Sequence, residues 1–298
     1  MTKLEYKGYT VTEEKDRVIV KGVRDFDPVH IFECGQCFRW VRQKDGSYTG
    51  VARGRVVNIS FQDGTLVIKN SSLEDFLNIW FEYLDLGRDY SEIKNMVAKD
   101  DIMKEAVSFG SGIRLLRQDF HETVISFIIS ANNMIPRIKQ IIAKICRQYG
   151  DAFDFKGVKM FSFPSLEKLA LSCEEELSFC KAGYRCRYIV ETSKMLFDNC
   201  IDTEILKNGD SGSARKELMK LPGVGSKVAD CILLYSGTRY DVFPTDVWVR
   251  RVMGELYLGQ DATLGQIQAF AREYFGPYAG FAQQYLFYFA RENKLGVS

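Results

Sequence analysis

The sequence predicts an α+β protein, in which an antiparallel β-domain precedes a mainly helical body. Two Asp-Gly pairs, at 45–46 and 63–64, lie between segments that alternate apolar and polar residues, a pattern typical of β-hairpins. From about residue 100 onward the apolar residues recur with the period of an α-helix. We therefore predict a β-unit with flanking helices over residues 1–105 and a helical unit over 106–298.

The β-domain is predicted from short segments rich in β-branched residues. One such segment is RVIVKGV at 17–23, and a second run of alternating residues surrounds the two Asp-Gly turns. Val57, Ile59 and Phe61 precede the second turn, and Leu66 and Ile68 follow it, which predicts an antiparallel meander. A helix over 71–84, capped by Ser71 or Ser72, is expected to follow.

The helical body is predicted most clearly at residues 136–150. A proline stands at the first turn, four isoleucines form one apolar stripe, and Gly150 follows the last turn. Further helical segments are predicted at 163–172, 173–180, 185–199, 212–221, 225–236, 245–257, 263–275 and 278–293.

The overall charge gives no indication of a nucleic-acid partner, because 40 basic residues are balanced by 39 acidic ones and the formal net charge is +1. Any basic surface must therefore be local. No apolar run is long enough to cross a bilayer and none is shaped like a secretion signal. We expect a protein that is not secreted and has no membrane partner, in the cytoplasm (at the nucleoid in a prokaryote) or in a eukaryotic nucleus. The eight scattered cysteines predict free thiols.

Residues 214–236 predict a helix, a tight turn and a second helix. We expect Pro222 to end the first helix, Gly223 and Gly225 to permit positive φ, and Ser226 to cap the second helix. Main-chain N–H groups at such a turn form an anion site, for which a DNA phosphate is the natural occupant. A plain helical hairpin is the alternative. The groups expected at the phosphate belong to Gly223, Gly225 and Val228.

Lys227 lies on the first turn of that second helix, where the helix dipole and partial burial disfavour its ammonium form. A neutral amine there is a nucleophile toward carbon. The alternative is a lysine that binds phosphate through charge alone. Asp246 precedes an amphipathic helix and is expected to cap it. A carboxylate near the amine would also stabilise a developing cation or assist proton transfer.

Five motifs resemble the 8-oxoguanine DNA glycosylase/lyase family, within the helix–hairpin–helix DNA glycosylase superfamily. They occur in the family's order: GQCFRW (35–40), SANNMIPRI (130–138), GYRCRY (183–188), LPGVGSKVADC (221–231) and GPYAGFAQ (276–283). The resemblance implies a twisted sheet packed on a helical body, and base-excision repair of double-stranded DNA that contains oxidised guanine. It identifies Lys227 with the nucleophile that attacks C1′ and forms a Schiff base before β-elimination, and Asp246 with the accompanying carboxylate.

The resemblance also implies a pocket for the extruded base. Gln283 matches the reader of the base edge and Phe287 the stacking ring, four residues apart on one helix face. Cys231 matches the residue on the other side of the base. Gly35 matches the glycine whose carbonyl accepts the N7–H that 8-oxoguanine carries and guanine lacks. Without the motifs around them, the preferred interpretation of Gln283 and Phe287 would be a surface amide beside a core aromatic residue.

The opposite strand would meet a second group of residues. Asn132 matches the residue that fills the gap left by the base, and Tyr184 matches an aromatic wedge. Arg137 and Arg185 match the pair that donates to the unpaired cytosine, which implies a preference for cytosine opposite the lesion. The alternative is that both arginines bind phosphates.

The chain departs from the family at two positions, with Met134 in place of an asparagine and Trp248 in place of a phosphate-contacting histidine. No cofactor is required, although the family's hairpin can hold a cation through main-chain oxygens, here near Met219, Leu221 and Val224. We expect a monomer. Two alternatives remain open: a glycosylase of the same superfamily for alkylated bases or other purines, and a non-enzymatic DNA-binding helix–hairpin–helix protein.

Overall fold

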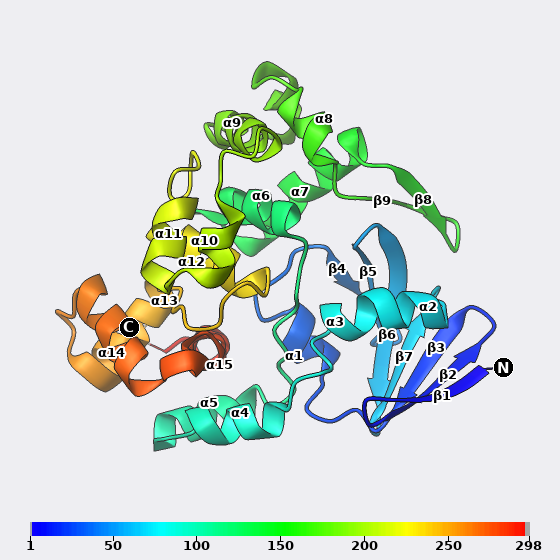
Figure 1. The fold of residues 1–298 in the computed structure, drawn as a ribbon, viewed down its shortest axis with the longest axis horizontal. Helices are drawn as coiled ribbons and strands as arrows, with labels where there is room; N and C mark the ends of the chain where they lie inside the picture. The colour runs from blue at the N-terminus through cyan, green and yellow to red at the C-terminus, as the bar shows by residue number, and fades with distance from the viewer. Residues whose placement is uncertain (1, 296–298) are drawn as a thin grey trace.

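The computed structural model describes residues 2–295; Met1 and residues 296–298, at the ends of the two predicted units, lie outside them. A twisted β-sheet lies beside a larger helical body (Figure 1), so the α+β prediction is confirmed. All pairs of neighbouring strands in the seven-stranded sheet are antiparallel, in the order β1-β2-β3-β7-β6-β5-β4. The strands are β1 (Thr2–Tyr6), β2 (Tyr9–Glu14), β3 (Arg17–Lys21), β4 (Trp40–Arg42), β5 (Tyr48–Ala52), β6 (Arg55–Gln62) and β7 (Thr65–Lys69).

Both Asp-Gly turns occur where they were predicted. The turn at 63–64 joins β6 to β7 with both residues at positive φ (48° and 72°), the geometry of a tight hairpin. No comparable turn was predicted after β1, because the segment 2–14 is mostly polar. It turns at Lys7-Gly8, again with both φ angles positive.

One face of the sheet carries the first hydrophobic core. Ile59, Leu66 and Ile68 pack with Phe76 and Trp80 of the following helical segment. That segment comprises α2 (Leu73–Asp75), a π-helical turn (Phe76–Trp80) and α3 (Phe81–Tyr83). It begins at Ser72, whose side chain accepts from Asp75 N in a capping box, so Ser72 rather than Ser71 is the cap.

Helices dominate the remainder of the chain. The prediction for α7 (Ile135–Tyr149) is confirmed, with Pro136 in its first turn, Gly150 after its last residue and its isoleucine stripe buried. The other α-helices are α1 (Pro28–Phe32), α4 (Tyr90–Val97), α5 (Asp101–Phe109), α6 (Phe120–Ser130), α8 (Leu166–Ala170), α9 (Arg185–Phe197), α10 (Thr203–Asn208), α11 (Ser211–Leu218), α12 (Ser226–Tyr235), α13 (Val247–Met253), α14 (Leu264–Tyr274) and α15 (Ala279–Glu292). Among the described residues, no helix is both long and apolar enough to cross a membrane.

The second hydrophobic core lies in the helical body and includes the buried side chains of α4 and α5. These two helices pack against α15 at the other end of the chain. A division of the chain at residue 105 falls within α5, so the exact boundary between the two units stays a prediction.

The helical body contains one β-hairpin that the sequence did not predict. Strands β8 (Ala152–Phe155) and β9 (Val158–Phe161) follow α7 and extend from the helical body toward the sheet (Figure 1). The two strands are short and are separated only by a Lys-Gly turn, so their alternating pattern does not stand out from the helical periodicity of the neighbouring segments. The body is therefore mainly helical, as predicted, but this hairpin interrupts the helical series.

The two units are joined through buried polar groups near residue 36. Gln36 is fully buried; its amide donates to the carbonyls of Ile31 and Arg114, and its Oε1 accepts from Leu116 N at 2.8 Å. Arg39 forms an ion pair with Glu122 of α6 at 3.1 Å. These contacts fix the segment that carries Gly35 against the helical body.

The helix–hairpin–helix is held by an ion pair between its two helices. Arg215 of α11 donates to Asp230 of α12 at 2.6 Å, and the Asp230 side chain is 1% exposed. Burial raises the pKa of Asp230 to about 6, against the opposing effect of Arg215. The folded protein therefore binds a proton at Asp230 more tightly than the unfolded chain does.

We predict that Asp230→Asn changes the pH dependence of stability. Because the folded-state pKa is raised, the stability contribution of wild-type Asp230 is fully present below about pH 4 and decreases as pH rises through about 6. Relative to Asp230→Asn, the wild type should lose on the order of 2 kcal/mol over that range. Urea denaturation at several pH values measures the difference, and a constant difference between pH 4 and 7 would contradict the assignment.

Candidate active site

The turn between α11 and α12 differs from its prediction in three ways. The first helix ends at Leu218, before Pro222, because the turn starts to close there with Leu221 N donating to Leu218 O at 3.1 Å. The second helix starts at Ser226 after Gly225 as N-cap, and no side chain caps it. Gly223 has a φ of +79°, whereas Gly225 has a φ of −90° that any residue adopts. The predictions for Pro222, for the Ser226 cap and for positive φ at Gly225 are wrong.

The absence of a side-chain cap leaves this helix start open to an external anion. Ala229 N is the first amide that bonds back within the turn, to Gly225 O at 2.9 Å, so the preceding amides have no acceptor in the helix. Val228 carries one of these amides. A side chain added at Gly225 would meet nothing within 4 Å. The local arrangement is that of a phosphate site, with free N–H groups at the positive end of the helix dipole.

Gly223 is required by space as well as by φ. A Cβ at this position would lie 2.6 Å from Cδ2 of Tyr188 on α9. Tyr188 in turn packs edge-to-face on Tyr184, with ring centroids 5.7 Å apart. The hairpin turn is thus connected through Tyr188 to Tyr184, the residue predicted to be the wedge.

Lys227 lies on the first turn of α12 and is half-buried. Its Nζ is 5.7 Å from the ring centroid of Phe127 on α6. Cys231 stands one turn further along the same helix. Burial raises the pKa of the Cys231 thiol to about 11, and the neighbouring Lys227 charge opposes this shift. The amine is therefore held between a neutral thiol and an aromatic ring.

Asp246 is the N-cap of α13, as predicted, and accepts from Val249 N at 2.9 Å. Burial raises the pKa of its carboxyl group, while the hydrogen bond from Val249 and the charge of Lys227 act in the opposite direction. The carboxylate thus lies within electrostatic reach of the amine. The same carboxyl group can therefore cap α13 and interact with the amine of Lys227.

The residues predicted for the base pocket converge from two separate units. Gly35 has a φ of +87°, and a Cβ there would lie 2.9 Å from Cε1 of Phe287 on α15. Gln283, one turn earlier on α15, is 3% exposed, and its Oε1 has no partner among the described residues. Cys231 is equally buried on α12. Gln283 and Cys231 are thus almost fully buried, whereas Phe287 is partly exposed.

Sequence reasoning missed the residues that hold the Gly35 segment on α15. Gln284 donates to Cys34 O at 3.0 Å and accepts from the Tyr235 hydroxyl at 2.7 Å. It is fully buried, next to the predicted reader Gln283. The doubled glutamine in the sequence was the available signal, because two adjacent amides on one helix must face different neighbours.

Arg291 was also missed. Its guanidinium lies 5.3 Å from the Phe287 ring centroid and donates through Nη2 to Glu33 O at 2.5 Å. Nη1 lies 3.1 Å from the position of a Cβ built on Gly35 and has no partner among the described residues. Arg291 follows Phe287 by four residues, so the i, i+4 spacing on one helix face could have revealed it.

The residues predicted for the opposite strand form a second group. Tyr184 is 58% exposed, and Asn132 and Arg137 are exposed as well. Arg185 is buried, donates to the carbonyls of Ala131 and Asn132, and lies 4.5 Å from the Tyr184 ring centroid. In this conformation Arg185 shapes the Asn132 turn, and Arg137 is the more accessible of the two guanidinium groups.

The two residues that depart from the family pattern, Met134 and Trp248, lie beside the groups of residues described above. Met134 is 74% exposed directly before α7. Trp248, two residues after Asp246, has the Arg251 guanidinium 5.6 Å from its ring centroid. No cluster of three or more His, Cys, Asp or Glu side chains suited to a metal occurs within residues 2–295.

Two successive parts of the chain match models of known protein families. Residues 18–124 match the model of the 8-oxoguanine DNA glycosylase N-terminal domain, and residues 125–277 match that of the HhH-GPD superfamily of base excision DNA repair proteins. A probable N-glycosylase/DNA lyase of Methanothermobacter thermautotrophicus is 35% identical, over 72% of this chain and 75% of the relative. The N-glycosylase/DNA lyase OGG1 of Arabidopsis thaliana is 30% identical, over 86% and 75%.

Solved structures extend the similarity to the whole fold. The 8-oxoguanine glycosylase/lyase of Clostridium acetobutylicum, in complex with double-stranded DNA containing cytosine opposite 8-oxoguanine, is 45% identical with a TM-score of 0.93. The alignment covers 96% of this chain and 98% of that one. MBOgg1, in complex with a low-affinity DNA ligand, is 47% identical, also with a TM-score of 0.93, over 96% and 99%. The chain belongs to the 8-oxoguanine DNA glycosylase family.

Proposed function

We propose that this protein excises 8-oxoguanine from double-stranded DNA and cleaves the resulting abasic strand, with Lys227 as nucleophile. The half-buried amine on the first turn of α12, beside Cys231 and within electrostatic reach of Asp246, is the observation that carries the proposal. The amine attacks C1′ as the bond from C1′ to the base breaks and the base leaves with the electron pair. Loss of the amine proton and opening of the sugar give an imine. Removal of a C2′ proton then expels the 3′ phosphate by β-elimination.

Asp246 stabilises the positive charge that develops on the sugar and on the amine. Its burial makes this interaction stronger than it would be in water. The hydrogen bond from Val249 N fixes the carboxylate, so that the group does not have to reorganise as charge develops.

The base would enter between Cys231 and Phe287. In this position the free acceptor on Gln283 faces a base edge that offers N–H donors, and the main chain of Gly35 approaches without a side chain. The carbonyl of Gly35 would distinguish 8-oxoguanine through its N7–H. Arg291, behind Phe287, holds both sides of this pocket together.

Opposite the lesion, we propose that Arg137 donates directly to cytosine. Arg185 would first have to release the carbonyls of Ala131 and Asn132, and otherwise acts through the turn that it holds. Asn132 and Tyr184 would fill the space left by the extruded base.

The carbonyls of Met219, Leu221 and Val224 would hold a structural cation in the hairpin turn. Carbonyl oxygens suit a hard cation, and the Leu221 carbonyl accepts from Val224 N, which orients this turn. A monomeric state and a location in the cytoplasm, nucleoid or nucleus remain predictions. A relative for alkylated bases without a lysine nucleophile, and a DNA-binding protein without activity, both leave the placement of Lys227 unexplained.

We predict that Lys227→Gln abolishes excision while binding to lesion DNA is retained. Loss of the nucleophile should reduce single-turnover excision by a factor on the order of 10³ or more. Borohydride should trap a covalent adduct with the wild type and none with the variant. If Lys227→Gln still forms the adduct, the nucleophile is a different residue; if the intact protein forms none, the lyase proposal fails.

We predict that Arg137→Ala lowers the preference for cytosine over adenine opposite 8-oxoguanine. Loss of a bidentate contact should reduce the ratio of the two single-turnover rates by roughly tenfold. Arg272→Ala, an exposed arginine on α14, is the matched control. Equal losses of rate opposite both bases would assign Arg137 to a phosphate instead.

We predict that Arg291→Leu weakens discrimination between 8-oxoguanine and guanine. Leucine keeps part of the apolar stem but removes the hydrogen bond to Glu33 O and the cation over Phe287, so kcat/KM for 8-oxoguanine should fall roughly tenfold. Arg291→Lys should recover part of this loss. A change in thermal stability with an unaltered ratio of 8-oxoguanine to guanine excision would show that the residue is only structural.

A further inference from the structure

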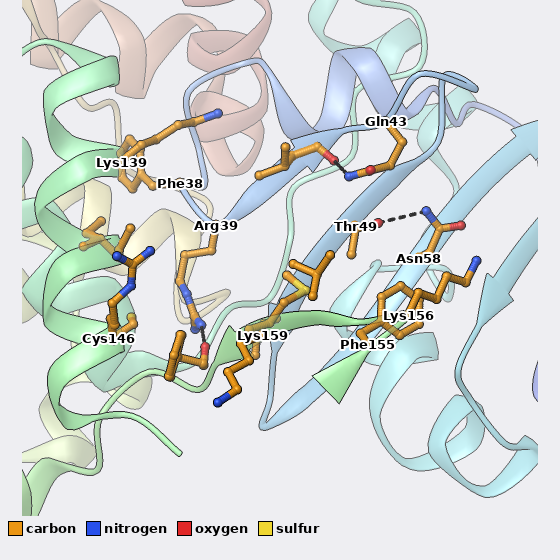
Figure 2. Close-up of a pocket in the computed structure, with 18 of the residues that line it drawn as sticks. Phe38, Arg39, Gln43, Thr49, Asn58, Lys139, Cys146, Phe155, Lys156 and Lys159 are labelled. Carbon is orange, nitrogen blue, oxygen red and sulfur yellow. Dashed lines mark hydrogen bonds between the residues drawn. The ribbon is translucent and has the colours of Figure 1, made fainter. Parts of the chain in front are cut away.

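The structure contains a groove that none of the predicted site residues lines. It lies between the outer face of the sheet, α7 and the β8–β9 hairpin, and its volume is about 880 Å³ (Figure 2). Phe38 lines it and also packs on Phe127, with ring centroids 5.6 Å apart. Since Phe127 in turn contacts Lys227, the groove adjoins the catalytic region through two aromatic side chains.

The lining of the groove carries a strong local excess of positive charge. Its only carboxylate is Asp45, whereas its cationic side chains are Arg39, Lys44, Lys139, Arg147, Lys156 and Lys159. Arg39 is neutralised by Glu122, but within residues 2–295 the other five cations make no ion pair. A chain of net charge +1 therefore concentrates unpaired cations here, which favours a polyanionic occupant.

The interior of the groove is suited to bases rather than to phosphate alone. Phe155 and Phe161 of the hairpin line it together with Phe38. Thr49 and Asn58 form its floor on the sheet and are hydrogen-bonded to each other at 3.0 Å (Figure 2). Aromatic rings interleaved with cations and a polar floor are the features by which proteins bind single-stranded nucleic acids.

The spacing of the cations favours a strand over a single nucleotide. Lys139 and Arg147 are eight residues apart on α7, a rise of about 12 Å, and other cations lie across the groove on the hairpin and at Lys44. Lys156 also lines a second cavity of about 520 Å³, where Lys15, Arg17 and Lys69 are accompanied by the acidic residues Glu14 and Asp16. A single phosphate would need converging cations, whereas these follow a path. A volume of about 880 Å³ is too small for a duplex and suits a short single-stranded segment.

We propose that this groove binds a single-stranded segment of DNA, separately from the damaged-base pocket. Its α7 wall begins at Lys139 and Gln140, within one turn of Arg137, so a strand that passes the opposite-base group can continue into it. The protein would therefore bind a lesion duplex that has a single-stranded flank more tightly than a blunt duplex. This proposal needs no catalysis, so it can be tested in Lys227→Gln protein without lesion DNA.

The first test is fluorescence anisotropy with a short fluorescein-labelled oligothymidylate. Lys44→Glu/Lys159→Glu, which changes exposed lysines on both sides of the groove, should weaken binding roughly tenfold and reduce the slope of log K against log salt by about 1.4. The matched control, Lys3→Glu/Lys21→Glu, changes two exposed lysines elsewhere on the sheet and should bind like the parent. Phe155→Leu should lower affinity by about tenfold through lost stacking. Equal binding by parent and groove variants would overturn the proposal.

Competition identifies the occupant. Unlabelled oligothymidylate should displace the probe at far lower phosphate concentration than dTMP or a blunt lesion-free duplex of the same length. Displacement by dTMP at equal phosphate concentration would identify a mononucleotide site, and equal displacement by the duplex would identify a general DNA contact. Either result contradicts the proposal. Photo-crosslinking from 4-thiothymidine should label peptides from 38–58 or 139–161, and labelling confined to other segments would also overturn it.

Discussion

The site depends on the attachment of one short segment, residues 33–36, to the start of the helical body and to α15. The carbonyls of Glu33 and Cys34 accept from Arg291 and Gln284, and Gln36 is bonded to the segment around residue 115. These contacts bring a glycine from the β-unit against Phe287, which lies more than 250 residues later. Without them, the proposed base pocket would have only one wall, since Cys231, Gln283 and Phe287 all belong to the helical body.

Burial shapes the chemistry of the site more than charge does. The Cys231 thiol stays neutral because it is desolvated, and the carboxyl group of Asp246 has a raised pKa despite the nearby lysine. A dry environment strengthens the interaction of Asp246 with a developing cation. The phosphate site that we propose at the start of α12 likewise uses neutral main-chain amides. Only the groove beneath the β8–β9 hairpin depends on a concentration of charged side chains.

Most of the fold and the central residues of the site could be predicted from the sequence. Asp-Gly turns and the isoleucine stripe of α7 are local signals, and the structure follows them. Residues whose role depends on partners far away in the chain could not be predicted. Arg291 and Gln284 bind a segment far away in the chain. Arg185 donates hydrogen bonds to main-chain carbonyls, which no sequence pattern predicts. The start of α12 was misjudged because Ser226 is a good cap by residue type, yet the turn closes one residue earlier.

The contact between Gly223 and Tyr188 restricts how the chain can vary. Any side chain at 223 would collide with the tyrosine ring, and the backbone there already occupies a conformation that other residues avoid. A smaller residue at 188 would remove the collision but also take away the support behind Tyr184. Substitutions at these two positions are therefore interdependent, and an alignment of homologues should show them changing together or not at all.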